Sequence, residues 1–125
     1  NILTNIDKIK NLLFDYVYFG SSLQYVKKYN KILKILLKKK IKYIYISAAS
    51  FFNSDILGDK IVLKQLNLLP SVLYCYSFNY RYILTLFKNN GYTEISNKKN
   101  SYKKINFCNF LKKIKYLNIL FKKKS

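Results

Sequence analysis

The sequence has 125 residues, half of them hydrophobic, so it is long and apolar enough to form the core of a single domain over residues 1–125. That composition excludes intrinsic disorder of the whole chain. Its 24 Lys and Arg residues against 5 Asp and Glu residues give a net charge of +19, which a compact domain tolerates best beside a polyanion. Nucleic acid, an anionic membrane surface or an acidic protein could neutralise this charge, and we favour nucleic acid.

The first half of the sequence predicts two helices and two strands. Apolar residues at positions 2, 6, 9 and 13 have helical spacing and predict a short amphipathic helix. Residues 16–19 form an apolar, β-favouring run that ends at Gly20, which indicates a buried strand. Ser21 and Ser22 suit a helix N-cap, and residues 23–40 carry an apolar stripe opposite lysines, so a helix is expected there. Residues 41–47 are mostly apolar on both faces, as in a strand covered on both sides.

The second half continues the alternation of strands and helices. A polar loop is predicted at 53–59, followed by a segment at 61–69 that leans helical and ends at Pro70. A buried strand at 72–77, a helix at 80–87 with a C-cap at 89–91 and a short strand at 93–96 come next. The sequence ends with a basic loop at 97–104, a final helix at 110–121 and a frayed basic tail at 122–124. Buried strands that alternate with amphipathic helices imply a parallel sheet. We therefore expect a doubly wound, flavodoxin-like α/β fold with helices on both faces of a parallel sheet.

The residue usage suggests an organelle. Lys, Asn, Ile, Tyr and Phe abound, whereas Arg81 is the single arginine, Pro70 is the single proline, and Trp, His and Met are absent. The abundant residues all have A/T-rich codons, which is typical of many mitochondrial and plastid genomes. The expected location is the mitochondrion, with a plastid-type organelle as the alternative.

The two cysteines, Cys75 and Cys108, form no Cys-x-x-Cys pair and are expected to be free thiols in a reducing compartment. Without histidine, a structural zinc site is not expected. The longest uncharged run, residues 65–80, contains Pro70 and is shorter than the ~20 apolar residues of a membrane-spanning helix. Charges from Asp7 onward also argue against a signal peptide.

Catalytic chemistry has little support in the sequence. Asp55 and Asp59 could form a carboxylate pair, but loop capping and local charge balance are the favoured interpretation. There is no histidine to act as a base and no glycine-rich phosphate loop. The turn at Gly20 could hold an anion, although a plain strand-to-helix turn is the simpler interpretation. We expect no enzyme activity, no cofactor and no small-molecule substrate.

The lysines instead form three clusters, at residues 27–40, 98–104 and 112–124. Lysine binds phosphate as a point charge and lacks the bidentate base recognition of arginine, so contacts with RNA backbone and RNA shape are expected. The predicted RNA-binding residues are Lys27, Lys28, Lys31, Lys34, Lys38, Lys39, Lys40, Lys98, Lys99, Lys103, Lys104, Lys112, Lys113, Lys122, Lys123 and Lys124.

The 13 tyrosines raise a second hypothesis, because unpaired bases stack on exposed aromatic rings. Core packing is the favoured role for most of them, including Tyr43, Tyr45 and Tyr74. Tyr92 and Tyr102 fall in predicted polar loops and are the expected exceptions.

Several short motifs occur in the order found in one ribosomal family. Phe19-Gly20-Ser21 ends the first predicted strand, and an aromatic pair followed by Asn53, three residues and Leu57-Gly58 comes next. Leu69-Pro70 then precedes an apolar strand and a helix that ends at Gly91. Across residues 15–96 these motifs resemble the bacterial-type small-subunit ribosomal protein number two family.

The resemblance implies a doubly wound sheet, contacts with small-subunit ribosomal RNA and a position near the head–body junction. The sequence departs from the family pattern at Ile56 in place of Trp, Asp59 in place of a second Gly, and Ser71 and Ser77 in place of Asp. The family's helical-hairpin insertion is also absent, which a shortened organellar version or a split gene would explain.

The leading hypothesis is a structural protein of an organellar small ribosomal subunit, with ribosomal RNA and neighbouring ribosomal proteins as partners. One alternative is another ribosomal or RNA-associated protein, including a large-subunit protein. A second is a basic peripheral subunit of an organellar membrane complex that contacts anionic lipid.

Overall fold

The computed structural model describes residues 6–68, 71–100, 106–107 and 114–125, and β-strands make up most of its regular structure. The helical elements are the 3-10 helices η1 (Ile6–Asn11) and η2 (Leu23–Tyr25) and the α-helices α1 (Tyr29–Leu37) and α2 (Tyr80–Asn89). The strands are β1 (Tyr16–Gly20), β2 (Tyr43–Phe52), β3 (Lys60–Leu68), β4 (Ser71–Asn79), β5 (Tyr92–Lys99), β6 (Asn106–Phe107) and β7 (Lys115–Lys123).

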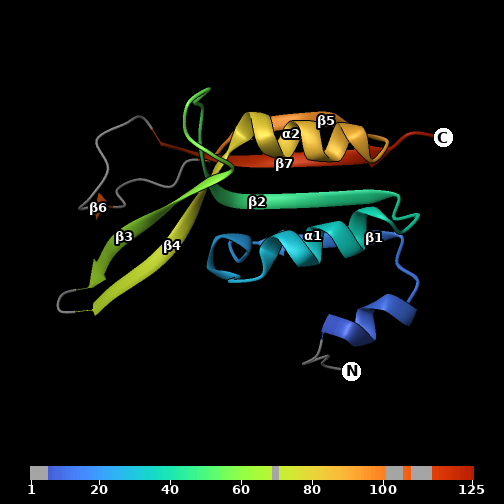
Figure 1. Cartoon of the computed structure of the whole chain (residues 1–125), viewed down its shortest axis with the longest axis horizontal. Coiled ribbons are helices and arrows are strands. Elements are labelled where there is room, and N and C mark those ends of the chain that lie inside the picture. The colour runs from blue at the N-terminus through green and yellow to red at the C-terminus, as the bar shows by residue number, and fades with distance from the viewer. Residues whose placement is uncertain (1–5, 69–70, 101–105, 108–113) are drawn as a thin grey trace.

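All these strands join one seven-stranded mixed sheet with the order β5-β7-β2-β4-β3-β6, and β1 pairs with β2 (Figure 1). β1 and β4 both run parallel to β2 along the same edge, β1 beside its first half and β4 beside its end. β7 lies antiparallel between β2 and β5, so β5 runs in the same direction as β1, β2 and β4. β3 pairs antiparallel with β4 and, over two residues, with β6, and the β3–β4 hairpin extends away from the rest of the sheet.

The predicted doubly wound parallel sheet is therefore wrong. Residues 61–69 lean helical in sequence, yet Lys60–Leu68 form β3, with Leu63 and Gln65 buried at the period of a strand. The predicted helix at 110–121 is β7 over Lys115–Lys123. Leu117 and Phe121 are four positions apart, a spacing that fits one face of a helix and one face of a strand equally well.

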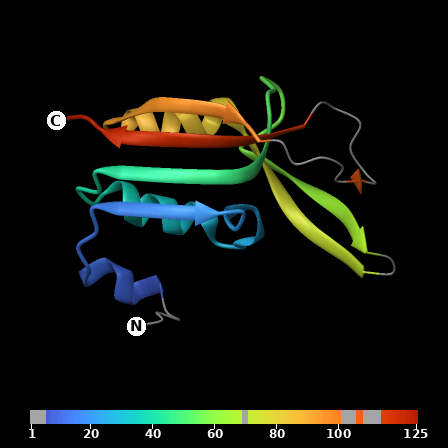
Figure 2. The same ribbon diagram turned by 180° about the vertical axis from the view of Figure 1, so that it is seen from behind.

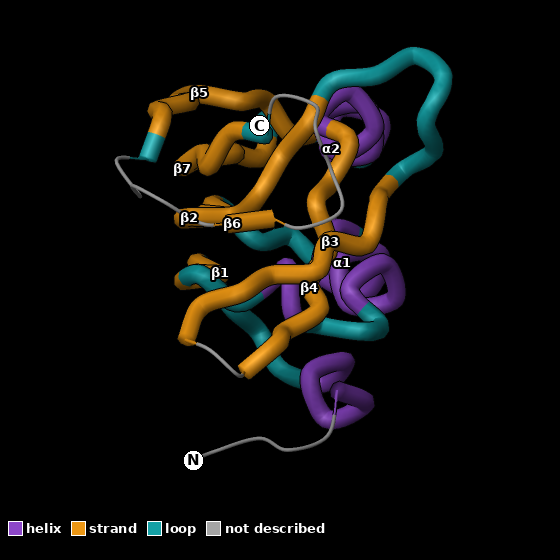
Figure 3. The backbone as a smooth tube through the Cα atoms, turned by 90° about the vertical axis from the view of Figure 1, so that its left-hand side faces the viewer, coloured by secondary structure: helices purple, strands orange, loops and turns teal. Residues whose placement is uncertain are grey.

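The predicted helices on both faces are also wrong, because α1 and α2 lie on one face of the sheet (Figure 3). The connections β1–α1–β2 and β4–α2–β5 cross the sheet in the same direction. Right-handed connections that run in the same direction place their helices on the same face. A doubly wound sheet needs a reversal of that direction, which this strand order does not provide.

Other predicted elements are confirmed with shifted ends. The strands at 16–19, 41–47, 72–77 and 93–96 correspond to β1, β2, β4 and β5, and the helix at 80–87 corresponds to α2. The expected full burial is wrong for β1, for the first half of β4 and for one face of β2, which are half-buried or exposed. The predicted helix at 23–40 is split into η2 and α1, and Ser22 makes no side-chain cap. The predicted loop at 97–104 begins later than expected, since β5 continues to Lys99.

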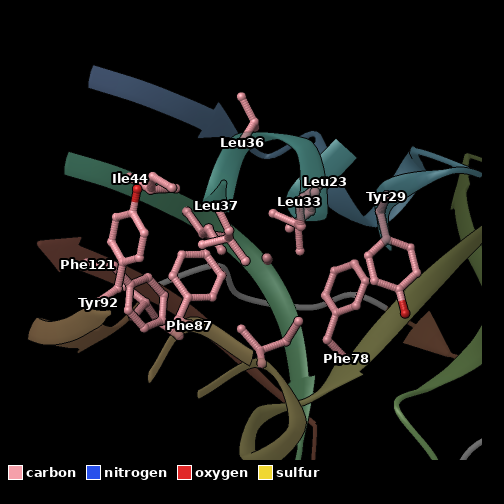
Figure 4. Packing of buried hydrophobic residues seen from close by; sticks show 14 of the residues in the cluster. Leu23, Tyr29, Leu33, Leu36, Leu37, Ile44, Phe78, Phe87, Tyr92 and Phe121 are labelled. Atoms are coloured by element: carbon pink, nitrogen blue, oxygen red, sulfur yellow. The ribbon is translucent and has the colours of Figure 1, made fainter. Parts of the chain in front are cut away.

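The core lies between the two α-helices and the sheet (Figure 4). Leu33 and Leu37 of α1 and Phe87 of α2 pack on Ile44 of β2 and Phe121 of β7. The Phe87 and Phe121 rings are stacked with their centres 3.8 Å apart. This packing fixes α2 over β7 and leaves the opposite face of the central strands without a helix among the described residues (Figure 2).

An irregularity in β2 is held by a side chain of β7. Ala48 has φ of +51°, and the β2–β7 register shifts between Ile46 and Ala49. The Asn118 Oδ1 accepts hydrogen bonds from the Ala48 N–H over 2.8 Å and from the Ser47 hydroxyl over 3.2 Å. Asn118 thereby provides an acceptor for the Ala48 N–H, which the bulge removes from the hydrogen-bond ladder between the strands.

Candidate RNA interface

Eight of the described lysines gather at one end of the sheet, which we call the basic end. Here α1, α2 and β7 end and β2 and β5 begin, close to the C-terminus of the chain (Figure 1). The lysines of the basic end are Lys38, Lys39, Lys40, Lys42, Lys88, Lys122, Lys123 and Lys124.

Backbone hydrogen bonds hold the segments of the basic end together. The Lys123 N–H donates to the Lys42 carbonyl over 2.9 Å, and the Lys124 N–H donates to the Gly91 carbonyl over 2.8 Å. The Gly91 N–H donates in turn to the Lys88 carbonyl over 3.0 Å. Gly91 has φ of +79°, a conformation that glycine adopts without strain, which allows the sharp turn from α2 into β5. Lysines from opposite ends of the sequence therefore share one surface.

Some ammonium groups of the basic end have defined positions. The Lys39 Nζ donates to the Leu12 carbonyl over 2.7 Å, and the Lys123 Nζ donates to the Asn90 carbonyl over 2.5 Å. The Lys123 Nζ also lies 4.6 Å from the centre of the Tyr92 ring. Carbonyl oxygens and ring faces orient an ammonium group but leave its net charge in place. The positive potential of this surface is thus partly preorganised.

Three of the described carboxylates have partners within the fold. Asp55 forms an ion pair with the single arginine, and Asp59 accepts a hydrogen bond from the Tyr29 hydroxyl over 2.5 Å. Glu94 accepts one from a tyrosine of α2 over 2.6 Å. Asp15 borders the basic end through its backbone. Its carbonyl oxygen accepts hydrogen bonds from the N–H groups of Lys42 and Tyr43. The chain has too few carboxylates to neutralise its lysines internally.

The C-terminal ends of α1 and α2 explain the presence of some lysines at the basic end. The C-terminus of a helix carries partial negative charge and favours nearby cations. Lys38 is the C-cap of α1, and Lys88 lies in the last turn of α2. Lys42 lies directly before β2, Lys122 lies in β7 and Lys124 directly follows β7, so none of the three is the C-cap or in the last turn of a helix. An external polyanion is the better explanation for these lysines.

The structure brings together parts of two predicted lysine clusters, those at residues 27–40 and 112–124. Lys38–Lys40 and Lys122–Lys124, far apart in sequence, meet at the basic end. Lys27 and Lys28 precede α1, and Lys31, Lys34 and Lys38 line a shallow hollow of about 320 Å³ on its exposed side. Lys98 and Lys99 lie at the far end of β5, away from the basic end. The remaining predicted residues, Lys103, Lys104, Lys112 and Lys113, lie outside the described residues.

Sequence reasoning missed Lys42 and Lys88 of the basic end. Lys42 directly follows the run Lys38–Lys40, which was a usable signal for including it. Lys88 belongs to the basic end because β7 returns beside β5, and no pattern in the sequence predicts that pairing. The misassignment of β7 as a helix is therefore the reason that the basic end was not predicted.

The tyrosines are distributed differently from the expectation. Tyr92, expected in a loop, is 1% exposed beneath the basic end, and its hydroxyl donates to the Ile41 carbonyl over 2.9 Å. Tyr74, expected in the core, is 66% exposed on β4. Tyr43 and Tyr45 are half-buried on the face of β2 opposite the helices. Tyr102, the other expected stacking residue, lies outside the described residues.

A cavity of about 550 Å³ lies at the opposite end of the sheet, between β2, α2, β5 and β7. It is lined in part by Phe51, Tyr80 and Asn97. The Tyr80 hydroxyl donates to Glu94, the Asn97 amide donates to Tyr80 over 3.2 Å, and burial together with the Glu94 bond raises the pKa of Tyr80 to about 12. These polar groups satisfy one another, so the cavity carries no evident reactive group.

Cys75 is a buried free thiol, and burial raises its pKa to about 11. Within the described ranges no cluster of three acidic or cysteine side chains is placed to hold a metal ion. Neither described α-helix has the length and apolar character needed to cross a membrane. Cys108 lies outside the described residues.

Comparisons with known proteins identify no relative of this chain. No family model matches the sequence, and no curated protein or solved structure is significantly similar to it.

Proposed function

We propose that this protein is a structural RNA-binding protein of an organellar ribosome. The proposed location is the small subunit of a mitochondrial ribosome. The observation that supports the proposal best is the convergence of eight lysines on the basic end of a folded mixed sheet. A net charge of +19 destabilises a compact domain through self-repulsion, and folded ribosomal RNA provides the dense negative charge that offsets it.

The proposed mechanism is charge neutralisation at a surface of fixed shape. Lys42, which directly precedes β2, and Lys122 of β7 are held by backbone hydrogen bonds and strand pairing, so their phosphate contacts carry little backbone entropy cost on binding. Lysine contacts position a protein on the RNA backbone without recognising base sequence. Binding of this kind supports a folded RNA.

The two finer parts of the proposal have separate supports. The organelle follows from the A/T-rich residue usage. The small subunit follows from the motif resemblance over residues 15–96. The mixed sheet removes the fold as a support for that choice, because the resemblance implies a doubly wound sheet.

Co-sedimentation with purified organellar ribosomal subunits tests the proposal. The protein should migrate with the small subunit and remain bound through the gradient at about physiological salt. A protein that stays at the top of the gradient contradicts the proposal. Migration with the large subunit overturns the small-subunit part, and crosslinked RNA fragments then identify its site.

Matched variants test whether the basic end is the contact surface. Lys38, Lys40, Lys122 and Lys124 are replaced together by Gln. The control replaces Lys27, Lys98, Lys99 and Lys115, which lie elsewhere, so both variants lose the same charge. The first variant should lose most of its subunit binding, and the control should retain most of it. Equal loss in both would indicate dispersed electrostatic attraction.

A further inference from the structure

On the face of the sheet where the described residues place no helix lie four tyrosines, which we call the tyrosine face: Tyr16 and Tyr18 of β1 and Tyr43 and Tyr45 of β2. They alternate along their strands with Val17, Phe19, Ile44 and Ile46, which point into the core. Successive side chains of a strand point to opposite faces, so the four tyrosines share the face opposite α1 and α2 (Figures 2 and 3).

The strand register arranges these rings in two rows across the sheet. Tyr16 is paired with Tyr43, and Tyr43 is paired with Lys122 of β7. In the next row Tyr18 is paired with Tyr45, and Tyr45 with Leu120. Rows two residues apart along a strand are separated by about 7 Å. The result is an aromatic platform on β1 and β2, with Lys122 and Leu120 of β7 along one edge.

Tyr16 and Tyr18 are 51% and 57% exposed, so the outer strand presents much of their ring surface to solvent. The Tyr18 ring is stacked with Tyr45, with ring centres 5.5 Å apart and an angle of 24° between the planes. It also lies back across Gly20, where a Cβ atom would come within 2.7 Å of the ring. Glycine at this position therefore allows Tyr18 to lie along the strand, with its ring available on the platform.

Positive charge borders the platform. The Lys42 Nζ and the Lys122 Nζ lie 5.7 Å and 5.9 Å from the centre of the Tyr43 ring. Both lysines belong to the basic end, which makes the platform continuous with the proposed phosphate-binding surface. An aromatic surface beside ammonium groups suits a ligand that combines planar rings with phosphates.

We propose that the tyrosine face binds the unpaired bases of a single-stranded RNA segment, which stack on its rings while Lys42 and Lys122 contact the adjacent phosphates. The inference rests on the proposed RNA-binding function and assigns it a second kind of contact. Stacking of this kind tolerates any base, since every base has a planar face. A second copy of this chain is a poor occupant, because it brings the same net charge of +19.

Equilibrium binding of two fluorescent RNAs, a 12-nucleotide single strand and a 12-base-pair duplex, tests the inference. In the variant Tyr16→Leu/Tyr18→Leu, affinity for the single strand should fall about 10-fold for each base that loses its stacking partner. Affinity for the duplex should change less than about 2-fold, since its bases are already paired and stacked. Circular dichroism and the melting temperature check that the variant is folded.

Two matched variants complete the experiment. Tyr16→Phe/Tyr18→Phe keeps the rings and should bind the single strand nearly as well as the unaltered protein. Tyr74→Leu removes a ring of β4 that is at least as exposed, far from the basic end, and should bind both RNAs normally. If the double leucine variant misfolds, single Tyr16→Leu replaces it with an expected loss of about 10-fold.

The outcomes separate this inference from the proposed function. If the double leucine variant still binds the single strand normally, the inference is wrong and the proposed function stands. The same holds if that variant loses single-strand and duplex binding equally. A self-association that Tyr16→Leu/Tyr18→Leu abolishes, seen by sedimentation velocity, also overturns the inference and assigns the face to a second copy. Failure of the unaltered protein to bind either RNA overturns the proposed function as well.

Discussion

The ammonium group of Lys123 lies 4.6 Å from the centre of the Tyr92 ring, where the end of β7 meets the start of β5. The ring itself is buried, and its hydroxyl donates to the Ile41 carbonyl over 2.9 Å. Tyr92 therefore joins β5 and β7 to the connection between α1 and β2 beneath the basic end. Its role is to hold the surface on which the lysines are displayed, so its substitution should affect stability before it affects binding.

Tyr92→Phe should lower the free energy of unfolding by about 1 kcal/mol, because it removes the bond to Ile41 and keeps the ring. Tyr92→Ala should lower it by about 3–5 kcal/mol, because it also removes a buried ring. Urea denaturation measures both changes. Affinity for RNA should be nearly unchanged in folded Tyr92→Phe. A larger loss of affinity than of stability would place the hydroxyl in the interface instead.

Salt dependence should report the lysines of the basic end. Each phosphate contact removed lowers the slope of log affinity against log salt by about 0.7–0.9. Replacement of Lys38, Lys40, Lys122 and Lys124 by Gln should reduce that slope more than the matched replacement of Lys27, Lys98, Lys99 and Lys115. Binding measured between 50 and 300 mM salt gives the two slopes. Identical slopes would contradict the assignment of the basic end.

Asn118 should stabilise the irregularity in β2. Asn118→Ala leaves the Ala48 N–H without its acceptor in a buried position, which should cost about 1–3 kcal/mol of unfolding free energy. Asn118→Asp keeps an acceptor oxygen and should retain most of the stability. Denaturation of the two variants in parallel separates loss of the bond from loss of the side chain. Equal destabilisation of both would show that the oxygen is not the important group.

Cys75 should react slowly with thiol reagents in the native state. Burial raises its pKa to about 11, so roughly one thiol in a thousand is ionised at pH 8. A Cys108→Ser background leaves Cys75 as the single reporter. Modification should be slow in buffer and fast in denaturing urea. Rapid modification in buffer would show that β3 and β4 separate readily around this side chain.

The protein should lose stability in alkaline solution. Burial and the bond to Glu94 raise the pKa of Tyr80 to about 12, and burial also raises the pKa of Tyr92. Between about pH 10 and pH 12 the folded state therefore holds protons that the unfolded state has lost, so the free energy of unfolding falls as pH rises. Tyr80→Phe should be less stable at pH 8 and should show a shallower fall above pH 10. An unchanged slope would exclude Tyr80 as a source of this dependence.

Most of the individual elements were predictable from local patterns. The apolar run of β1, the two-sided apolar character of β2 and the Asn-Asn-Gly end of α2 each identify an element without knowledge of its neighbours. The predicted lysines of α1 are exposed for the same reason, since a helix with one apolar stripe turns its charges to solvent. The two failures, β3 and β7, fall where the spacing of apolar residues fits a helix and a strand alike.

The sequence by itself determined that this protein is a strongly basic domain with an apolar core, because charge and hydrophobicity are properties of composition. Only the tertiary structure decided where that charge acts. The pairing of β7 between β2 and β5 brings Lys122–Lys124 beside Lys42, and the common direction of two connections places α1 and α2 on the face opposite the tyrosine face. Strand partners depend on contacts between distant segments, and no local pattern specifies them.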